Sequence, residues 1–564
     1  MGVNHMLVLL FLFTSAWSDT LPAIVIRGSS ANQTLELPVS GKSAATLGDA
    51  LRSVPGLTIM RAGGPGQPSA VFIRGASAEH TLVLIDGVEV NDASSPAGAF
   101  DFSTLDLNLV ERIEIYKGPQ SLRFGSGASA GVINVITRMG PRGPFARVRG
   151  GSYQTHQQSA GWLGGHYALG VSRFDTQGFS AVRKGSEADG FRQESAAGKF
   201  RWGGPDLGAE LSGRFTGARA ELDFGPLGDA DDPDYVSRTR RTLFSARGFG
   251  NWSEDLRGEI LISRQELARD YRTGGFREDH SARNWRVDAP FAWRTHSHVN
   301  LEFGPSFREE RGAKSEATSG FFSGLSFARE SDFAELGLRV DRHSRFGSFN
   351  TYAATLGGEW GGTRFTARAA NGFKAPSLYQ LHEPAFGNAE LKAETVSSIQ
   401  LGVNRELTQG LLAGLTLYRQ SYRDLIVFDG RYVNRARADV PGGEFELILA
   451  RERWNASLGA AYTDTSLPRR PRWGWSAGVD RLGDTWDARV EYRGVGRRRD
   501  IDAFTGAPFE LSSFDTLAAE FGWSFRPKWR TSFEIENAFD RDYQEVAGFG
   551  AAGLGAYAGV AYAP

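Results

Sequence analysis

Apolar and polar residues alternate along much of the chain after about residue 140. In residues 486–493, for example, Trp, Ala, Val and Tyr alternate with Asp, Arg, Glu and Arg. This pattern is typical of strands with one apolar and one polar face, in a soluble sandwich or in a membrane barrel. About 424 residues of it are too many for one ordinary sandwich. Divided among 22 strands, they give about 19 residues for each strand and its turn. A strand needs only roughly 9 to 11 residues to cross a membrane, so there is room for long outer loops.

The part of the chain before residue 140 has shorter, nearly continuous apolar runs and tight turns. Strands are predicted at residues 81–85, 88–90, 112–116 and 132–137. The first two are separated by Asp86-Gly87, a strong hairpin signal because a type I′ turn needs two residues that tolerate positive φ. We therefore expect a small mixed α/β domain ahead of the alternating region.

The N-terminus resembles a secretory signal. Residues 7–13 are apolar, and Ala16 and Ser18 place small residues at positions −3 and −1 before Asp19. The alternatives are a buried N-terminal strand or a misassigned start codon. No later segment has the roughly 18 consecutive apolar residues of a membrane helix. If the mature protein lies in a membrane, it must therefore span it as a closed barrel.

Composition excludes several other classes of protein. The chain has 564 residues, of which 70 are Gly and 12% are aromatic, as suits many turns and rings at membrane boundaries. The net charge of −1 gives no reason to expect nucleic-acid binding. The absence of Cys excludes disulfides, thiolate metal sites and cysteine nucleophiles. No zinc-protease or serine-hydrolase motif is present, and we expect no enzyme.

Two sets of motif blocks follow one another along the chain. The first set is Val-Pro-Gly-Leu-Thr-Ile at 54–59, Val-Phe-Ile-Arg-Gly at 71–75, Thr-Leu-Val-Leu-Ile-Asp-Gly-Val-Glu-Val-Asn-Asp at 81–92, Val-Glu-Arg-Ile-Glu-Ile at 110–115 and Gly-Val-Ile-Asn-Val-Ile-Thr at 131–137. The second set is residues 373–381, 387–394, 422–426 and 537–543. In this order the two sets resemble the plug and barrel motifs of the TonB-dependent receptors of the outer membrane, and within this family the chain looks most like the cobalamin receptors.

This resemblance implies an all-β membrane protein: a 22-stranded transmembrane antiparallel β-barrel with an N-terminal mixed α/β plug domain in its lumen. The expected parts are a signal peptide at 1–18, a TonB box at 19–26, a plug domain at 27–140 and the barrel at 141–564. The implied location is the outer membrane of a Gram-negative bacterium. The implied partners are TonB with its inner-membrane energising complex, outer-membrane lipid and lipopolysaccharide. We expect a monomer.

The segment next to the expected cleavage site is the candidate for contact with TonB. Pro22 favours extended backbone at Leu21, and the β-branched run at 24–26 is also suited to it. An extended segment can add to a sheet edge of a partner through main-chain hydrogen bonds. The alternative is that residues 24–26 form the first plug strand. The candidate TonB-binding residues are Asp19, Thr20, Leu21, Ile24, Val25 and Ile26.

Two further sets of plug residues are candidates for function. Buried charges need partners, and the resemblance implies that Arg74, Arg112 and Glu114 pair with carboxylates of the barrel lumen and hold the plug in place; the alternative is an ordinary exposed ion pair. Ligand contacts are expected from Gly-containing loops at the plug apex, where backbone can approach a bulky ligand. The candidate ligand-binding residues are Arg61, Gln67, Ser77, His80, Asn91 and Asp92.

An acidic stretch between early barrel strands is a candidate calcium site. Its carboxylates are Asp189, Asp223, Asp229, Asp231 and Asp232, and clustered oxygens are the ligands that Ca²⁺ takes. The resemblance implies loops ordered by calcium, and the alternative is a solvated acidic loop. His382 stands where haem receptors carry a ligand, but the short linking segment favours a neutral replacement. Residues 497–499, three Arg, are interpreted as a solvated loop or a contact with lipopolysaccharide phosphates.

The resulting hypothesis is TonB-dependent import of a scarce nutrient. The first candidate is cobalamin or a related corrinoid, and the alternative is a ferric siderophore, haem or another metal chelate. A passive porin or an outer-membrane adhesin is the alternative of another class, and the plug argues against a porin, which keeps an aqueous lumen. Apart from a possible structural Ca²⁺, no cofactor is expected.

Overall fold

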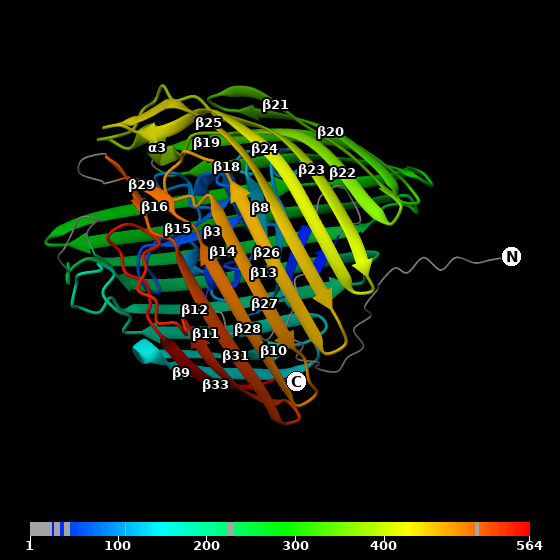
Figure 1. The fold of residues 1–564 in the computed structure, drawn as a ribbon. Coiled ribbons are helices and arrows are strands. Elements are labelled where there is room, and N and C mark those ends of the chain that lie inside the picture. The colour runs from blue at the N-terminus through cyan, green and yellow to red at the C-terminus, as the bar shows by residue number, and fades with distance from the viewer. Residues whose placement is uncertain are drawn as a thin grey trace.

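The chain forms a closed ring of antiparallel strands around a smaller domain (Figure 1). The computed structural model describes residues 25–27, 34–38, 46–107, 109–223, 231–312, 314–501 and 507–563. The ring consists of β9 (Gly143–Gly151), β10 (Thr155–Leu163), β11 (Tyr167–Thr176), β12 (Phe191–Gly203), β13 (Leu207–Glu221), β14 (Val236–Asn251), β15 (Leu256–Thr273), β16 (Phe276–Asp288), β17 (Phe291–His296), β18 (Val299–Arg311), β19 (Ser315–Arg329), β20 (Asp332–His343), β21 (Gly347–Trp360), β22 (Thr363–Lys374), β23 (Glu394–Thr408), β24 (Leu411–Phe428), β25 (Tyr432–Ala450), β26 (Trp454–Thr463), β27 (Trp473–Arg481), β28 (Trp486–Val495), β31 (Phe514–Arg526), β32 (Trp529–Glu536) and β33 (Gly555–Tyr562).

Two of these elements are halves of one strand. Both β16 and β17 lie between β15 and β18, and they are separated at Ala289 and Pro290. Proline has no N–H for the ladder, so an interruption is expected there. The described residues therefore form a 22-stranded barrel, as the sequence predicts. The last strand, β33, pairs with β9 and closes the ring.

The two ends of the barrel differ. At one end the strands are joined by tight turns, such as 361–362 and 409–410. At the other end, on the left of Figure 1, longer connections carry α3 (Leu378–His382), β29 (Arg498–Ile501) and β30 (Pro508–Leu511), and η3 (Ser152–Gln154) lies between β9 and β10. Membrane barrels have short periplasmic turns and longer outer loops, which orients the molecule. Exposed Trp side chains lie at the short-turn end: Trp202, Trp252, Trp360, Trp454, Trp486 and Trp529.

The exposed face of the strands is apolar, as alternation predicts. Leu336, Leu338 and Val340 of β20 are exposed, whereas the alternate residues Arg339 and Asp341 are buried and face inward. In a barrel this arrangement places apolar side chains toward lipid and charged ones in the lumen. None of the described helices has the length and apolarity required to cross a membrane.

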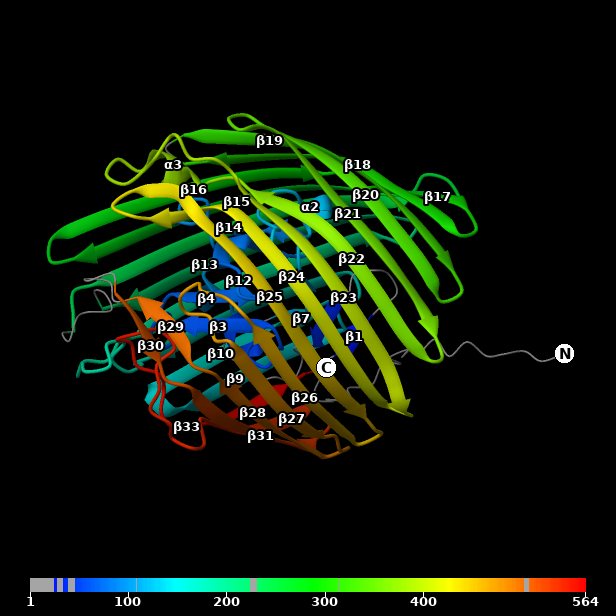
Figure 2. The same cartoon turned by 45° about the horizontal axis from the view of Figure 1, so that its top comes forward.

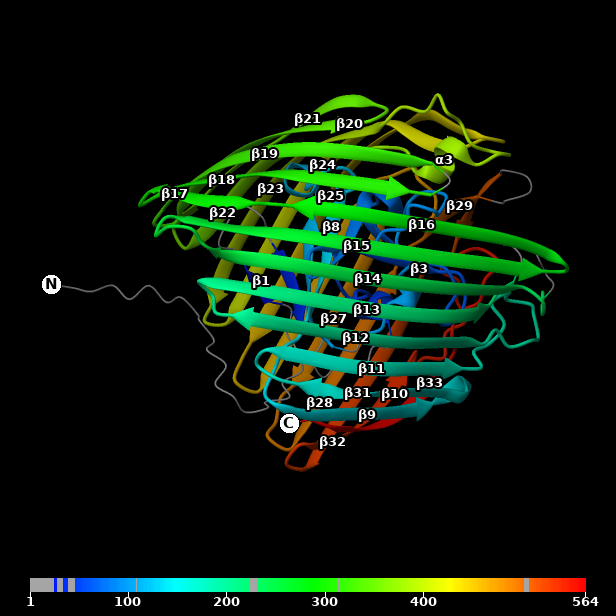
Figure 3. The same ribbon diagram turned by 180° about the vertical axis from the view of Figure 1, so that it is seen from behind.

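The smaller domain fills the lumen and is the plug (Figures 2 and 3). Its main sheet has the order β1-β2-β7-β8-β5-β6, with β5 and β8 parallel, and a separate hairpin pairs β3 with β4. Its elements are β1 (Val25–Arg27), β2 (Thr34–Pro38), α1 (Leu47–Ala50), β3 (Leu57–Arg61), β4 (Ser69–Ile73), η1 (Ala78–His80), β5 (Thr81–Ile85), β6 (Val88–Glu89), η2 (Phe102–Thr104), β7 (Val110–Lys117), α2 (Ser121–Phe124) and β8 (Gly131–Thr137).

The predicted hairpin and its turn are confirmed. Asp86 and Gly87 both have positive φ, 50° and 84°, and join β5 to β6. The strands predicted at 112–116 and 132–137 lie within β7 and β8. The plug core is continuous with apolar residues of the barrel wall, which come from β14, β15 and β23 to β25. The plug is thus packed against particular strands of the barrel.

Candidate functional site

The most buried cation of the plug is held by the barrel. Arg74 is 2% exposed, and its Nε donates to Oε1 of Glu444 on β25 at 2.9 Å. Its Nη1 donates to Gln400 on β23 at 2.7 Å. Lys117 of β7 donates to the second oxygen of Glu444 at 3.1 Å. One barrel carboxylate is therefore shared by two plug cations, as a buried charge in a low-dielectric lumen requires.

Further plug carboxylates meet barrel cations on the far side of the lumen. Glu89 binds Arg286 at 3.2 Å and Arg308 at 2.6 Å. Asp86 lies 3.2 Å from Lys199, and Asp92 pairs with Arg269. These acidic residues were not identified as anchors from the sequence. The available signal was their position in or beside apolar strands, where an acidic side chain is seldom buried without a partner.

The other predicted charge pair is placed differently. Nη1 of Arg112 donates to Glu111 at 2.9 Å, and its Nη2 donates to Glu114 at 2.8 Å. The second oxygen of Glu114 accepts from Asn134 of β8 at 3.1 Å. These contacts lie within β7 and between β7 and β8, so they stabilise the plug sheet itself.

His80 lies at the interface between plug and barrel. It is 1% exposed, and its Nε2 is 3.0 Å from Oε2 of Glu394 on β23. Its ring stacks on Tyr422 of β24, with ring centroids 5.2 Å apart. The other oxygen of Glu394 accepts from the backbone N–H of Ile426 at 2.7 Å. This predicted ligand residue therefore has internal partners on two barrel strands.

The other predicted ligand residues are also engaged inside the protein. Gln67 donates to the carbonyl of Glu221, and Asn91 bridges the backbone of Val83 and Thr81. The remaining two contacts are a hydrogen bond from Arg61 to Asp49 and one from Arg470 to Ser77. Among the described apex residues, Pro68 and Pro96 are exposed instead. The ligand-binding role of the six residues stays a prediction.

A row of aromatic side chains crosses the outer mouth. Tyr271 of β15, His280 of β16, Tyr379 of α3 and Tyr432 of β25 follow one another with ring centroids 5.9 to 6.2 Å apart. Phe428 continues the row, 5.3 Å from Tyr432. All five rings are at least partly exposed. Rings from five separate elements thus form one surface, which is suited to stacking on an aromatic ligand.

Three acidic residues meet in the outer loops. Oxygens of Glu187, Asp189 and Asp223 all lie within 4.8 Å of one another. Asp189 is 1% exposed, and its Oδ1 has no hydrogen-bond partner among the described residues. Burial raises the pKa of Asp189 to about 8, and the charges of Asp223 and Glu187 add to the rise. The arrangement favours either a bound proton or a cation.

The other described residues of the predicted calcium site lie outside this three-residue cluster. Asp231 accepts from the backbone N–H groups of Ser186 and Glu187, and these hydrogen bonds lower its pKa. Asp232 accepts from Thr273 at 2.8 Å. Asp229 lies outside the described residues. Glu187, which the sequence analysis did not single out, belongs to the cluster because the chain folds back between β11 and β12.

Arg498 and His382, two basic residues at the outer end of the barrel, have side chains that point inward. Arg498 was expected in a solvated loop, but it is 2% exposed and donates to the carbonyls of Ser512 and Gln544. That interpretation was wrong for Arg498, because the hairpin of β29 and β30 turns its side chain toward the barrel. His382 is nearly buried beside Glu316, with 3.8 Å between Nε2 and Oε1.

The candidate TonB segment is described only in part. Asp19, Thr20, Leu21 and Ile24 lie outside the described residues. Val25 and Ile26 belong to β1, which pairs with β2 at the edge of the plug sheet. Their assignment to the TonB box stays a prediction.

The fold and these contacts define a transmembrane barrel whose lumen is closed by a plug anchored through buried charges. The profile described as TonB-dependent Receptor Plug Domain matches residues 39–132, and the one described as TonB dependent receptor-like, beta-barrel matches residues 132–538. The chain belongs to the TonB-dependent receptor family, which carries out TonB-dependent transport at the outer membrane of Gram-negative bacteria.

Solved structures share this fold at low sequence identity. The siderophore receptor PirA from Acinetobacter baumannii is 17% identical with a TM-score of 0.81, covering 94% of this chain and 98% of that chain. The ferric enterobactin receptor PfeA from Pseudomonas aeruginosa, as a mutant in complex with enterobactin, is 18% identical with a TM-score of 0.79, covering 94% and 99%. The copper transporter OprC is 16% identical with a TM-score of 0.79, covering 96% and 100%.

Proposed function

We propose that this receptor imports a ferric siderophore and that the aromatic row at the outer mouth is the surface that first holds it. The observation that carries the proposal is this row, from Tyr271 to Phe428. Many siderophores chelate iron through aromatic rings and carry negative charge. Aromatic side chains stack on such rings, and the guanidinium of Arg269, which also pairs with Asp92, lies 5.8 Å from the ring centroid of Tyr271.

The structural neighbours support this class of ligand over cobalamin. Two of the three neighbours described above are receptors for siderophores, and one of them was solved with enterobactin. A soft copper site is less suited to this chain, because Cu(I) prefers Cys and Met ligands. The chain has no Cys and four Met, and Met60 is buried in the plug.

Binding of ferric enterobactin by the purified receptor tests the proposal, with cyanocobalamin and haemin as competing ligands. The double variant Tyr379→Ala/Tyr432→Ala should weaken binding roughly tenfold, since two aromatic pairs each contribute about 0.5–1.5 kcal/mol. Tyr352→Ala is the matched control, because Tyr352 is exposed on the outer face of β21. If the receptor binds cyanocobalamin but does not bind ferric enterobactin, the siderophore assignment is overturned and a corrinoid becomes the preferred ligand.

The corrinoid remains the second candidate because of the acidic cluster. Glu187, Asp189 and Asp223 bring together carboxylate oxygens of the kind that Ca²⁺ takes, and the orphaned oxygen of Asp189 suits a cation ligand. The likeness to cobalamin receptors implies calcium-ordered outer loops. Calcium should therefore protect these loops from protease, and Asp189→Asn should abolish the protection. Asp234→Asn is the control, because Asp234 is exposed outside the cluster; protection that is equal in both variants would remove the site.

Energy coupling is assigned to residues 19–26 in this proposal. A deletion of residues 19–24 leaves β1 in place, whereas a deletion of 19–26 also removes two of its residues. Both deletions should abolish uptake and leave ligand binding unchanged. Undiminished uptake after the shorter deletion would show that TonB acts elsewhere on the chain.

A further inference from the structure

One carboxylate of the plug lies close to two arginines of the barrel beneath the aromatic row. Asp92 is 1% exposed, and its Oδ1 accepts from the backbone N–H of Ser94 at 2.9 Å and from the hydroxyl of Ser94 at 2.6 Å. These two bonds shape the plug loop of residues 92–98. The Oδ2 of Asp92 forms the ion pair with Arg269 of β15. One oxygen is therefore engaged inside the loop, and the other accepts from the barrel.

Arg269 connects this carboxylate to the aromatic row. Its Nη1 donates to the hydroxyl of Tyr271 at 3.1 Å, and its side chain is 14% exposed. An anionic group that stacks on Tyr271 therefore comes within reach of the same guanidinium. Hydrogen bonds between charged groups are stronger than those between neutral groups. Such a ligand competes with Asp92 for Arg269.

The second arginine has no carboxylate partner of its own. Arg241 of β14 is 6% exposed and forms no ion pair with any residue that the structure describes. Its Nε lacks a hydrogen-bond partner there, its Nη1 reaches Thr104 at 3.5 Å, and its guanidinium lies 4.8 Å from the ring centroid of Phe100. A buried cation without a carboxylate is costly. Asp92 is the carboxylate whose charge acts on it most strongly.

The two arginines lie close enough to share Asp92. Arg241 is paired with Leu267, two residues before Arg269, so the arginines are diagonal neighbours on the inner face of β14 and β15. Residues in such positions lie about 7–8 Å apart, which long side chains can span. The plug backbone just before Asp92 is fixed, since Gln265 donates to the carbonyl of the preceding residue at 3.2 Å. Asp92 can therefore change partner by a movement of its own loop, without a shift of the plug sheet.

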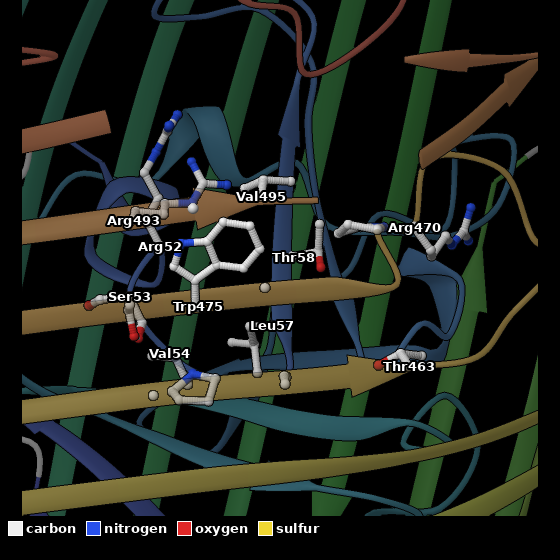
Figure 4. A pocket seen from close by; sticks show the side chains of 18 of the residues that line it. Arg52, Ser53, Val54, Leu57, Thr58, Thr463, Arg470, Trp475, Arg493 and Val495 are labelled. Carbon is white, nitrogen blue, oxygen red and sulfur yellow. The ribbon is translucent and has the colours of Figure 1, made fainter. Parts of the chain in front are cut away.

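A carboxylate at another wall of the lumen shows the fully paired arrangement. Glu545, in the outer connection between β32 and β33, binds Arg52 of the plug at 2.9 Å and Arg493 of β28 at 3.3 Å. The two arginines lie beside each other at the small cavity between the plug and β26 to β28 (Figure 4). Glu545 thus pairs with both of its cations at once, whereas Asp92 pairs with one of two.

We propose that Arg269 senses the charge of the bound ligand and that Asp92 changes partner in response. The negative charge of a ferric siderophore on the aromatic row draws Arg269 away from Asp92. Asp92 then pairs with Arg241, which compensates the buried cation and moves the loop of residues 92–98 toward β14. A neutral ligand leaves the pair of Arg269 and Asp92 intact. Selection for charge in this way rests on the proposed siderophore function.

Hydrogen exchange of the backbone amides in residues 92–98 of the ligand-free receptor tests the partner change. Arg269→Gln should raise the exchange only slightly, because Arg241 takes over Asp92. Arg241→Gln alone should leave it unchanged. The double variant should raise it roughly tenfold, more than the two single variants together, as in other coupled ion-pair networks. Equal exchange in Arg269→Gln and the double variant would overturn the partner change, whichever ligand the receptor carries.

The affinity of the purified receptor for ferric enterobactin provides a second test. Asp92→Asn should strengthen binding about threefold, because it removes a competitor for Arg269 and a negative charge near the ligand. Arg241→Gln should weaken binding in the otherwise unchanged receptor and have no effect when combined with Asp92→Asn. Equal weakening in both backgrounds would mean that the ligand itself contacts Arg241, and this result would overturn the proposal.

Two controls separate this proposal from the siderophore assignment. Arg493→Gln removes one of the two cations of Glu545 and should leave both the affinity and the exchange of residues 92–98 unchanged. Any binding of cyanocobalamin, which carries no net charge, should be unaffected by Arg269→Gln. A receptor that does not bind ferric enterobactin would overturn the siderophore function, and hydrogen exchange would then decide the partner change by itself.

Discussion

The plug meets the barrel through two kinds of interface. Toward β25 and β15 to β18 it uses buried ion pairs, such as Arg74 with Glu444 and Glu89 with Arg286. Toward β26 and β27 it meets mainly Gly, Ala, Ser and Thr, and it leaves a small cavity there that Trp475 also lines. Because a buried charge is costly to separate from its partner, the first kind resists displacement and the second permits it. The difference shows how the plug can be held firmly at one side of the lumen and still be displaced at another.

The largest effect is expected at the charged interface. Arg74→Ala leaves Glu444 with Lys117 as its remaining cation and should destabilise the plug by about 3 kcal/mol. The measurement is the denaturant concentration at which the plug becomes sensitive to protease inside the intact barrel. The double variant Arg74→Ala/Glu444→Ala should recover part of the loss. Equal loss in the single and double variants would show that the ion pair does not hold the plug.

A smaller effect is expected at the ionic contact across the cavity. Glu545→Gln keeps the shape of the side chain but weakens its bonds to Arg52 and Arg493, at a cost of about 1–3 kcal/mol. Protease should then cut residues 52–58 more readily, while the region around Arg74 stays protected. Increased cleavage at both places would mean that the two interfaces are not independent.

The acidic cluster shows what happens to a buried carboxylate that lies beside other carboxylates. The pKa of Asp189 is raised to about 8, from 3.8 in the unfolded chain. Its contribution to stability is therefore fully present below pH 4 and is lost as the pH rises through 8. In a calcium chelator, cleavage of the loop between β11 and β12 should increase over this range. Asp189→Asn should flatten this pH dependence, although Glu187, whose pKa is also raised by burial, still titrates; an unchanged profile would contradict the assignment.

The smallest effect is expected at the small-residue wall. Ser476→Ala removes one hydrogen bond to Ser53 and should destabilise the plug loop by about 1 kcal/mol. Uptake should be unchanged or slightly faster. A loss of uptake in Ser476→Ala would indicate that this contact positions the plug for transport.

Local patterns predicted the elements of the fold. Alternation over residues 141–564 predicted two-faced strands, and Asp86-Gly87 predicted the hairpin of β5 and β6, because strand faces and turn angles depend on neighbouring residues. The barrel itself was predicted from the length of the alternating region and from the family resemblance. The pairing of Arg74 with a carboxylate of the barrel lumen was implied by the family resemblance. The sequence could not show that Arg112 donates to Glu111 and Glu114 of its own strand, because a carboxylate of the barrel would be an equally suitable partner.

The sequence by itself determined a plugged outer-membrane barrel and its family, through periodicity and ordered motifs. Only the tertiary structure decided which carboxylate meets which cation, that His80 is enclosed by Glu394 and Tyr422, and that Glu187 joins Asp189 and Asp223. It also decided that Gly459 and Gly474 face one plug loop across a cavity. These contacts join residues far apart in the chain, and their pairing follows from how the barrel closes around the plug rather than from any local preference.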